Sequence, residues 1–318
     1  MNVITGIDFG GTTIKLGLVS ERGDLLEKTR IPFDHRKSLV DLINSVCEPL
    51  ETLIASTKGD LTAIGIATPG YADPETGILI DGTNNVPVLR GHSLPALFGD
   101  RFGVPAFIDN DGICAVTGEL LFGAGRGFRN FVLITLGTGI GGGVVINGEV
   151  VMGRKGQPPE IGAICLDPEG PVNFSGIRGT FERLACASGV VDLYMNLSGR
   201  QEPTLTAEEV FRFAKEGDGA ALFTLDRVAR HIAQAFGIMI NLLNLDACII
   251  GGGISAAGPT LLEAVRKHLP SFTWPLLYRH TQVLLAQLGN DAGLIGAAAM
   301  AVRRLANEQR GPGNISDR

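Results

Sequence analysis

The sequence predicts an α/β protein of two domains, on three observations. Its 318 residues exceed the usual size of one domain, and a content of 45% hydrophobic and 19% charged residues is typical of a globular chain with a large core. Apolar runs of strand length alternate with runs of helical spacing. Two stretches about 130 residues apart, ITGIDFGGTTIKLGLVSERGDLL and VLITLGTGIGGGVVINGEVV, share one design: an apolar strand, a Gly/Thr turn, a second apolar strand and a short turn with glycine. Two half-molecules with a common plan are therefore expected, since a solenoid would repeat over a far shorter period.

The first third of the chain is expected to begin with strands. The turns DFGGT and ERGD separate three apolar runs, which predicts a β-meander. A helix follows because apolar residues recur at helical spacing, and LTAIGIAT is typical of a buried strand that Pro-Gly ends. The region YADPETGILIDGTNNVPVLRGH is rich in Gly, Pro, Asp and Asn, which favours loop and hairpin. In order, the expected elements are strands at 2–9, 13–20 and 24–33, a helix at 38–56, a strand at 61–68, loops at 71–92, a helix at 94–102, a strand at 105–111 and a helix at 112–123.

The rest of the chain is expected to repeat the meander and then to become mainly helical. NFVLITLGTGIGGGVVINGEVVMG is the second meander, and the apolar run DACIIGGG interrupts the later helices with a strand. The expected elements are a meander at 130–153, helices at 181–197, 206–217 and 219–245, a strand at 246–253, a helix from about 260, a strand at 281–287 and a helix at 294–306. The polar tail 307–318 is expected to be disordered.

Charge and composition exclude several classes of function. The net charge is −6 and Lys and Arg form no long run, so neither nucleic acid nor an anionic membrane is an expected partner. No basic segment leads into an apolar stretch at the start, and no run reaches 18 apolar residues. The five cysteines are scattered, without a CxxC pair, which favours reduced thiols. We therefore expect an unexported, cytoplasmic protein.

Three glycine turns each follow an apolar strand. They are Gly10–Gly11 with Thr12 and Thr13, Gly137–Gly143 with Thr138, and Gly251–Gly252–Gly253 with Ser255. Backbone N–H groups of such turns can converge on phosphate oxygens, and Thr or Ser hydroxyls add donors. Three of them together predict a site for one polyphosphate nucleotide. The alternative, a tight hairpin without a ligand, stays open for any one turn alone.

The run GTGIGG also fits the dinucleotide pattern G-x-G-x-x-G. That pattern is meaningful only where a helix follows the glycines, whereas GGVVINGEVV is rich in β-branched residues and predicts a strand. An NAD-dependent enzyme is therefore disfavoured. The chain contains no GxxxxGK[ST] motif, which excludes a P-loop.

Two aspartates lie at or near the ends of expected strands. Asp8 ends the first strand beside Gly10, where a carboxylate can hold Mg²⁺ directly or through water, or can simply form the turn. Asp111 ends the strand PAFIDND and begins a helix, where it can cap the helix or act as a general base that accepts a proton from a hydroxyl. In the second case Asn110 would hold the acceptor through its amide. Lys15 falls within a strand and is expected to be solvated or structural.

Several motifs in order resemble the ROK family of sugar kinases and sugar-responsive repressors. The similar segments, over about residues 3–305, are GIDFGGTTIKLGLV, GIATPGYADPETG, DNDGICAVTGE, LITLGTGIGGGVVINGEV, EIGAICLDPEG and CIIGGGIS. The resemblance implies the actin/hexokinase-like (RNase H-like) fold, with two domains and a cleft between them. It divides the chain into an N-terminal domain, 1–112, completed by the C-terminal helix at about 291–306, and a larger domain, 113–290.

The same resemblance implies the site of an ATP-dependent sugar kinase. It places the ATP phosphates on Gly10, Gly11 and Thr12 and on Gly137, Thr138 and Gly139, and the adenosine near Gly251, Gly252 and Gly253. It makes Asp111 the general base toward a sugar hydroxyl, usually the 6-hydroxyl of a hexose, and the position of Asp8 at its strand end fits a carboxylate for the Mg²⁺ of that nucleotide. Sugar contacts are implied for Asn85, Asn110, Asp111, Glu160 and Glu182. A homodimer is also a family expectation.

The chain departs from the family pattern at the structural zinc site. The usual histidine is replaced by Ala163, and Asn173, Ser175 and Thr180 stand in the three cysteine places, so zinc is not expected. Gly176, Arg178, Gly179 and Glu182 still match, which suggests that hydrogen bonds replace the metal. Leu89 stands where relatives often carry Trp, and with Ala163 it leaves the identity of the sugar open.

Three classes of function fit these residues to different degrees: a sugar kinase, a repressor and a sugar-binding protein without catalysis. A glucokinase-like hexose kinase fits the intact Asp8, Thr12, Asn110, Asp111 and Thr138, and an N-acetylhexosamine kinase fits the same residues. A sugar-sensing repressor of this family carries about 70–80 residues of helix-turn-helix before the first kinase strand, whereas here that strand begins at Val3. A sugar-binding protein without catalysis is suggested only by the missing zinc ligands.

Overall fold

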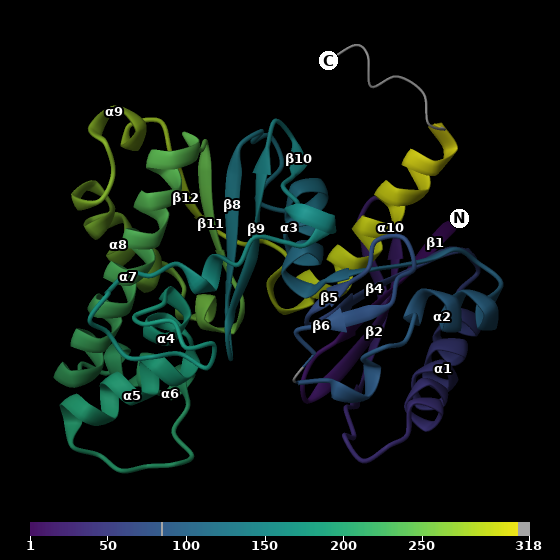
Figure 1. Ribbon diagram of the computed structural model, residues 1–318, viewed down its shortest axis with the longest axis horizontal. Helices are drawn as coiled ribbons and strands as arrows, with labels where there is room; N and C mark the ends of the chain where they lie inside the picture. The colour runs from purple at the N-terminus through teal and green to yellow at the C-terminus, as the bar shows by residue number, and fades with distance from the viewer. Residues whose placement is uncertain (84, 311–318) are drawn as a thin grey trace. The chain divides into compact units, whose positions relative to one another are not determined.

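The computed structural model describes residues 1–83 and 85–310 and divides into two compact units (Figure 1). The first unit comprises Met1–Gly123, Met152–Pro158 and the chain from Asp291 onward, and the second comprises Ala124–Val151 and Pro159–Asn290. The first unit thus keeps residues up to Gly123, whereas the resemblance implies a boundary at residue 112. The C-terminal helix belongs to the first unit.

The first unit is built on a five-stranded sheet with the strand order β3-β2-β1-β4-β7. Strands β1 and β2 pair antiparallel, with Asp8 opposite Lys15, and β1, β4 and β7 run parallel. The elements of this unit are β1 (Asn2–Phe9), β2 (Thr13–Ser20), β3 (Leu25–Pro32), α1 (Leu39–Ser56), β4 (Asp60–Thr68), β5 (Tyr71–Ala72), β6 (Leu79–Asp81), the 3₁₀ turn η1 (Pro87–Leu89), α2 (Leu94–Phe102), β7 (Ala106–Asn110), α3 (Asp111–Phe122), the 3₁₀ turns η2 (Arg154–Gly156) and η6 (Gly289–Asp291) beside its boundaries, and α10 (Ala292–Arg310).

The two faces of this sheet are packed in different ways. On one face Ile7 and Phe9 of β1 join a buried apolar cluster with residues of α1 and α2. The other face is close to α10, because Gly6 and Gly65 have no side chain: a Cβ at Gly6 would run into the carbonyl of Leu294, and one at Gly65 into that of Ala297. Side chains alternate along a strand, so Asp8 lies on the same face as Gly6, toward α10.

The second unit repeats this design on a sheet of order β10-β9-β8-β11-β12. Its first three strands form an antiparallel meander, and β8, β11 and β12 run parallel, so the repeated plan predicted from the sequence is confirmed. The elements are β8 (Phe131–Leu136), β9 (Ile140–Ile146), β10 (Glu149–Val150), η3 (Ile161–Ala163), α4 (Phe181–Ala185), α5 (Ala187–Ser198), α6 (Ala207–Lys215), α7 (Gly219–Leu243), β11 (Ala247–Gly251), η4 (Gly253–Ala257), α8 (Pro259–His268), η5 (Leu269–Ser271), α9 (Pro275–Tyr278) and β12 (Gln282–Leu285). Their apolar residues form one large core between this sheet and helices α4–α8. These helices lie together beside the sheet (Figure 1).

Two expectations about helices are wrong. The single helix expected at 181–197 is two helices, because Cys186 is extended (φ −74°, ψ 173°) and the N–H of Ala187 donates to the carbonyl of Gly137 at 2.9 Å. Residues 307–310 of the expected disordered tail belong to α10, whose helical run continues through Arg310. The remainder of that tail lies outside the described residues. None of the described helices is both long and apolar enough to cross a membrane.

Candidate active site

The first glycine turn joins β1 to β2 and is held by its own backbone. The N–H of Gly10 donates to the carbonyl of Thr13 at 3.0 Å, so that N–H already has an acceptor. Gly11 accepts a hydrogen bond from His35 Nε2 at 2.9 Å and lies beside Asn85, whose Cβ would be 3.5 Å from a Cβ at Gly11. The turn and the exposed Asn85 are therefore neighbours, as a shared site requires.

Asp8 lies at the end of β1 with only 14% of its side chain exposed. Its carboxylate is close to the beginning of α10, since a Cβ at Gly293 would be 2.7 Å from Oδ2. Lys15 Nζ approaches the same oxygen at 3.4 Å, which confirms the expectation of a structural lysine. Burial raises the pKa of Asp8; Lys15 opposes this shift and the charge of Asp291 adds to it.

Asp111 is the first residue of α3 and keeps access to solvent. The protein surrounding its carboxyl raises the pKa of Asp111 to about 6, and the negative charge of Asp8 acts in the same direction. Its Oδ1 accepts a hydrogen bond from the N–H of Gly112 at 2.8 Å, which opposes the shift. Because the exposed side of the residue meets water, solvent screens part of both effects. The result is a reachable carboxylate that is a stronger base than an ordinary aspartate.

The helix cap that the sequence offered to Asp111 is provided by Asn110 instead. Asn110 Oδ1 accepts hydrogen bonds from the N–H groups of Gly112 at 2.9 Å and Ile113 at 3.4 Å, and Nδ2 donates to the carbonyl of Gly70 at 3.1 Å. These bonds hold the end of β7 against the turn after β4. Asp111 is thereby left without a capping role.

An ion pair next to these residues was not foreseen from the sequence. Asp109, with 13% of its side chain exposed, accepts a hydrogen bond from Arg304 Nη2 of α10 at 2.8 Å. Burial raises the pKa of Asp109, and Arg304 opposes this shift. No local pattern could reveal the pair, because 195 positions separate the partners.

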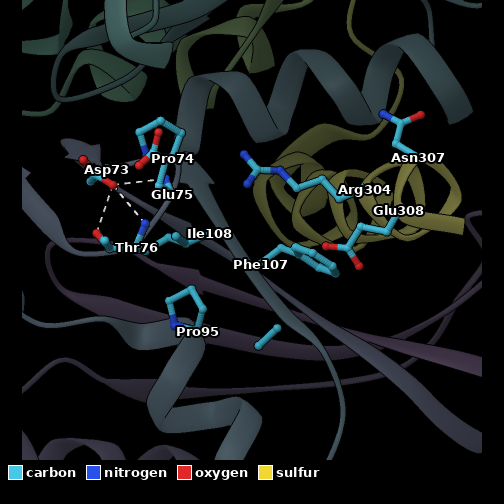
Figure 2. A pocket seen from close by; sticks show the side chains of 12 residues that line it. Asp73, Pro74, Glu75, Thr76, Pro95, Phe107, Ile108, Arg304, Asn307 and Glu308 are labelled. Atoms are coloured by element: carbon cyan, nitrogen blue, oxygen red, sulfur yellow. Dashed lines mark hydrogen bonds between the residues drawn. The ribbon is translucent and has the colours of Figure 1, made fainter. Parts of the chain in front are cut away.

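Arg304 also lines a cavity of about 410 Å³ in the first unit (Figure 2). Its walls come from the β5–β6 hairpin, the beginning of α2, strand β7 and the end of α10. Figure 2 shows the carboxylate of Asp73 turned toward Thr76, from which it accepts hydrogen bonds through the N–H at 2.9 Å and through Oγ1 at 3.0 Å. The described lining includes none of the residues predicted to bind sugar or nucleotide.

The glycine turn of the second unit is shorter than the sequence suggests. Only Gly137, Thr138 and Gly139 form the turn, because β9 begins at Ile140 and Gly141–Gly143 are strand residues. The N–H of Gly137 donates to the carbonyl of Gly139 at 3.0 Å. Gly142 needs glycine for packing, since its φ is 141° and a Cβ there would run into the carbonyl of Leu133. The expectation of one turn over residues 137–143 is therefore wrong for residues 141–143.

Glu182 is bonded directly to this turn. Its Oε2 accepts a hydrogen bond from the N–H of Ile140 at 2.8 Å, and a Cβ at Gly139 would be 2.6 Å from the same oxygen. Glu160 is exposed and near enough to Glu182 for their charges to interact: partial burial raises the pKa of Glu160, and the charge of Glu182 adds to this shift. Glu182 thus lies beside the glycine turn of the second unit, and Glu160 lies near Glu182.

The third glycine turn packs onto the same strand. Gly252 has a φ of 82°, and a Cβ there would run into the backbone of Leu136, the last residue of β8. A Cβ at Gly253 would meet only Glu208 Oε1, at 4.0 Å. The structure therefore brings Gly137–Gly139 and Gly251–Gly253 together at one end of the second sheet.

Three of the four positions at which zinc ligands are missing, Asn173, Ser175 and Thr180, lie in a hydrogen-bonded loop, and the fourth, Ala163, ends η3. Asn173 Oδ1 accepts hydrogen bonds from the N–H groups of Ser175 and Ile177, and Thr180 caps α4 by accepting from the N–H of Arg183 at 3.2 Å. In the part of the chain that the structure describes, no group of three or more His, Cys, Asp or Glu side chains could hold a metal ion. Leu89 is fully buried in the apolar core of the first unit.

Metal analysis of the purified protein is expected to find no stoichiometric zinc. Amide, hydroxyl and methyl groups at these positions cannot supply the thiolate and imidazole ligands of a structural zinc site. Mass spectrometry of the protein after gel filtration measures this directly. One zinc ion per chain would show that residues 173–180 are wrongly matched to the ligand positions.

The residues present fit a nucleotide with Mg²⁺. Mg²⁺ prefers oxygen ligands and is commonly held by one or two carboxylates together with phosphates, and Asp8 offers a nearly buried carboxylate beside a glycine turn. The N–H groups of Thr138 and Gly139 take no part in the described bonds of their turn, which leaves two donors for an anion.

Comparison with known proteins identifies the family of this chain. The ROK family model matches residues 4–304. The chain is 35% identical to a glucokinase of Thermotoga maritima over 314 residues, which cover 95% of this chain and 98% of that protein. It is 33% identical to a glucokinase of Halalkalibacterium halodurans over 322 residues, covering 96% and 97%.

A solved structure supports the fold. The ROK family glucokinase of Streptomyces griseus, crystallised with glucose and AMPPNP, superposes with a TM-score of 0.80 at 29% identity and covers 95% of this chain and 99% of that one. The expected actin/hexokinase-like α/β fold is thereby confirmed. Family model, relatives and fold all agree, and the chain belongs to the ROK family.

Proposed function

We propose that this chain is an ATP-dependent hexose kinase in which Asp111 is the general base. The observation that carries the proposal is the state of that carboxyl: it is reachable by solvent, it is free of the helix cap, and its pKa is raised to about 6. A base of this kind is ionised to about nine-tenths at pH 7 and yet accepts a proton more readily than an ordinary aspartate.

In the first unit the proposed roles follow from position. Asp111 takes the proton of the attacking sugar hydroxyl, which we propose to be the 6-hydroxyl. Asn85, beside Gly11, and the second N–H of Asn110 Nδ2 hold neighbouring hydroxyls. The turn of Gly10, Gly11 and Thr12 receives phosphate oxygens. Mg²⁺ near Asp8 would supply charge neutralisation for the phosphates when it is bound.

In the second unit one group of residues is proposed to bind the sugar and another to bind the nucleotide. Glu160 and Glu182 accept hydrogen bonds from sugar hydroxyls, and their mutual repulsion favours a ligand that brings donors to both. Gly137, Thr138 and Gly139 receive phosphate, and the turn of Gly251, Gly252 and Gly253 borders the adenosine, with open space at Gly253. The relative that was crystallised with glucose and AMPPNP supports ATP as the phosphoryl donor.

The test is a coupled assay of ADP formation with a panel of sugars. Glucose is expected to give the highest kcat/KM, with glucosamine, N-acetylglucosamine, N-acetylmannosamine, fructose and allose as competitors. A clear preference for an N-acetylhexosamine would keep the chemistry and change the substrate. Sugar binding by calorimetry with no ADP formed from any sugar would instead favour a sensor without catalysis.

The pH dependence follows from the raised pKa of Asp111. Because the base must be ionised to accept a proton, kcat/KM is expected to be level above pH 6 and to fall about tenfold per pH unit below it. Rates of the wild type between pH 4.5 and 8 with saturating coupling enzymes measure this. A level profile down to pH 5 would contradict the raised pKa of Asp111, since an aspartate base with the unshifted pKa of 3.8 would still be ionised at pH 5.

Three further expectations remain proposals. Mg²⁺ is proposed as the activating metal, which omission and titration of the metal in the assay would test. A homodimer is proposed from the family resemblance, and light scattering after gel filtration would measure it. The predicted cytoplasmic location and the absence of a nucleic-acid partner rest on composition and charge.

A further inference from the structure

The segment between the two predicted sugar-binding glutamates contains a hairpin organised by one side chain. Asn173 Oδ1 accepts three hydrogen bonds: from the N–H of Ser175 at 3.0 Å, from Ser175 Oγ at 2.7 Å and from the N–H of Ile177 at 3.0 Å. Its backbone N–H donates to the carbonyl of Ile177 at 2.9 Å, and its carbonyl accepts from Gly176 at 3.1 Å. Five hydrogen bonds of this hairpin thus meet at one residue.

Apolar packing cannot hold this hairpin closed. Within residues 171–178 every residue except Asn173 is exposed, and Phe174 exposes 85% of its surface. Burial of apolar area is the usual source of stability for a short hairpin, and it is lacking here. The hydrogen bonds of Asn173 therefore decide the shape of the segment.

The base of the hairpin is closed by backbone hydrogen bonds and is also bonded to the residues that precede it. Val172 and Arg178 form a bridge, and the N–H of Gly179 donates to the carbonyl of Pro171 at 2.8 Å. The carbonyl of Gly179 in turn accepts from the N–H of Leu166 at 2.8 Å. Gly179 has a φ of 52°, and a Cβ there would run into the carbonyl of Asp167, so only glycine fits at this close approach of the two segments.

The segment that follows the base of the hairpin leads directly to Glu182. Thr180 bridges to Cys165 and caps α4, in which Glu182 is the second residue. Glu182 Oε2 is then fixed by the N–H of Ile140 at 2.8 Å. The segment that leaves the hairpin therefore leads into the first turn of α4, from which Glu182 reaches the glycine turn.

We propose that Asn173 is a positioning residue for Glu182, and that it holds the sugar-binding end of α4 in place without a metal ion. Its importance for catalysis rests on the proposed role of Glu182 toward sugar. Loss of the three acceptor bonds lets the hairpin open, so that the start of α4 shifts and the Glu182–Ile140 bond weakens. Asp111 belongs to the other unit and keeps its own environment.

The kinetic test compares three variants. Asn173→Ala removes the acceptor and is expected to raise the KM for sugar about tenfold, the equivalent of one or two hydrogen bonds, while kcat stays within about threefold. Asn173→Asp keeps an acceptor oxygen and is expected to stay within about threefold of the wild type in both constants. Ser175→Ala, which loses only the hydroxyl bond, is the matched control and is expected to behave as Asn173→Asp does. An unchanged KM in a folded Asn173→Ala protein would overturn the proposal.

A second measurement does not depend on activity. Amide hydrogen exchange at Ile140 reports the bond to Glu182, and it is expected to be faster in Asn173→Ala than in the wild type, Asn173→Asp or Ser175→Ala. If Asn173→Ala does not fold, Asn173→Ser, which retains one short acceptor, is measured in its place. Faster exchange at Ile140 in a protein that phosphorylates no sugar would leave the positioning role intact and remove the proposed function. Unchanged exchange at Ile140 would remove the positioning role whatever the activity.

Discussion

Asp111→Asn is expected to lower kcat by about 10²–10⁴-fold while the dissociation constant for sugar changes by less than about threefold. An amide has nearly the shape of the carboxylate and can still hydrogen bond to a hydroxyl, but it cannot accept the proton. The larger part of the barrier reduction in phosphoryl transfer comes from positioning and charge, so a residual rate should remain. Single-turnover ADP formation and sugar titration by calorimetry measure the two quantities separately.

The control for this variant is Asp60→Asn, at the exposed beginning of β4. It removes one negative charge from the same unit and is expected to leave kcat within about twofold. Asp111→Asn should also melt at or above the temperature of the wild type: the pKa of Asp111 is raised in the folded state, so at pH 7 the folded protein bears the cost of a charge near Asp8. Turnover of Asp111→Asn within threefold of wild type would remove Asp111 as the base.

Gly65→Ala is expected to destabilise the first unit by about 3 kcal/mol or more, at the upper end of the range for overpacking a core. A Cβ at residue 65 would overlap the backbone carbonyl of Ala297 in α10, and no rotation of a side chain can relieve a clash with backbone. The helix cannot retreat freely, because Gly296 lies equally close to the carbonyl of Cys114 in α3. Thermal unfolding should shift down by roughly 5–10 °C, and amide exchange in β1 and β4 should show the loss locally.

Gly99→Ala is the matched control for the core substitution. Gly99 lies inside α2 of the same unit, and a Cβ there would be 3.4 Å from the carbonyl of Val104, which is an ordinary contact. Alanine is also favoured over glycine within a helix by about 1 kcal/mol. We therefore expect equal or slightly higher stability. A Gly65→Ala protein as stable as Gly99→Ala would show that α10 can move away from the sheet.

Some of the candidate site could be predicted from local pattern, and some could not. The Asp-Asn-Asp run after an apolar strand predicts a polar strand end and the start of a helix. Only the structure shows that Asn110 caps the helix and that Asp111 does not. The pairing of Asp109 with Arg304 joins residues 195 positions apart, and no periodicity connects them. The sequence also did not show why residue 139 must be glycine: a Cβ there would be 2.6 Å from Oε2 of Glu182.

By itself, the sequence determined the class of fold and the repeated half-molecule, because strand, turn and helix signals are local and act over a few residues. It also predicted a kind of chemistry, through carboxylates and glycine turns at strand ends. Only the tertiary structure decided which glycines face open space and which face another backbone, where the helix at 181–197 breaks, and how a loop without metal ligands is held. Those outcomes depend on contacts between segments distant in the chain, such as Gly65 with Ala297 and Ala187 with Gly137, and a one-dimensional pattern does not contain them.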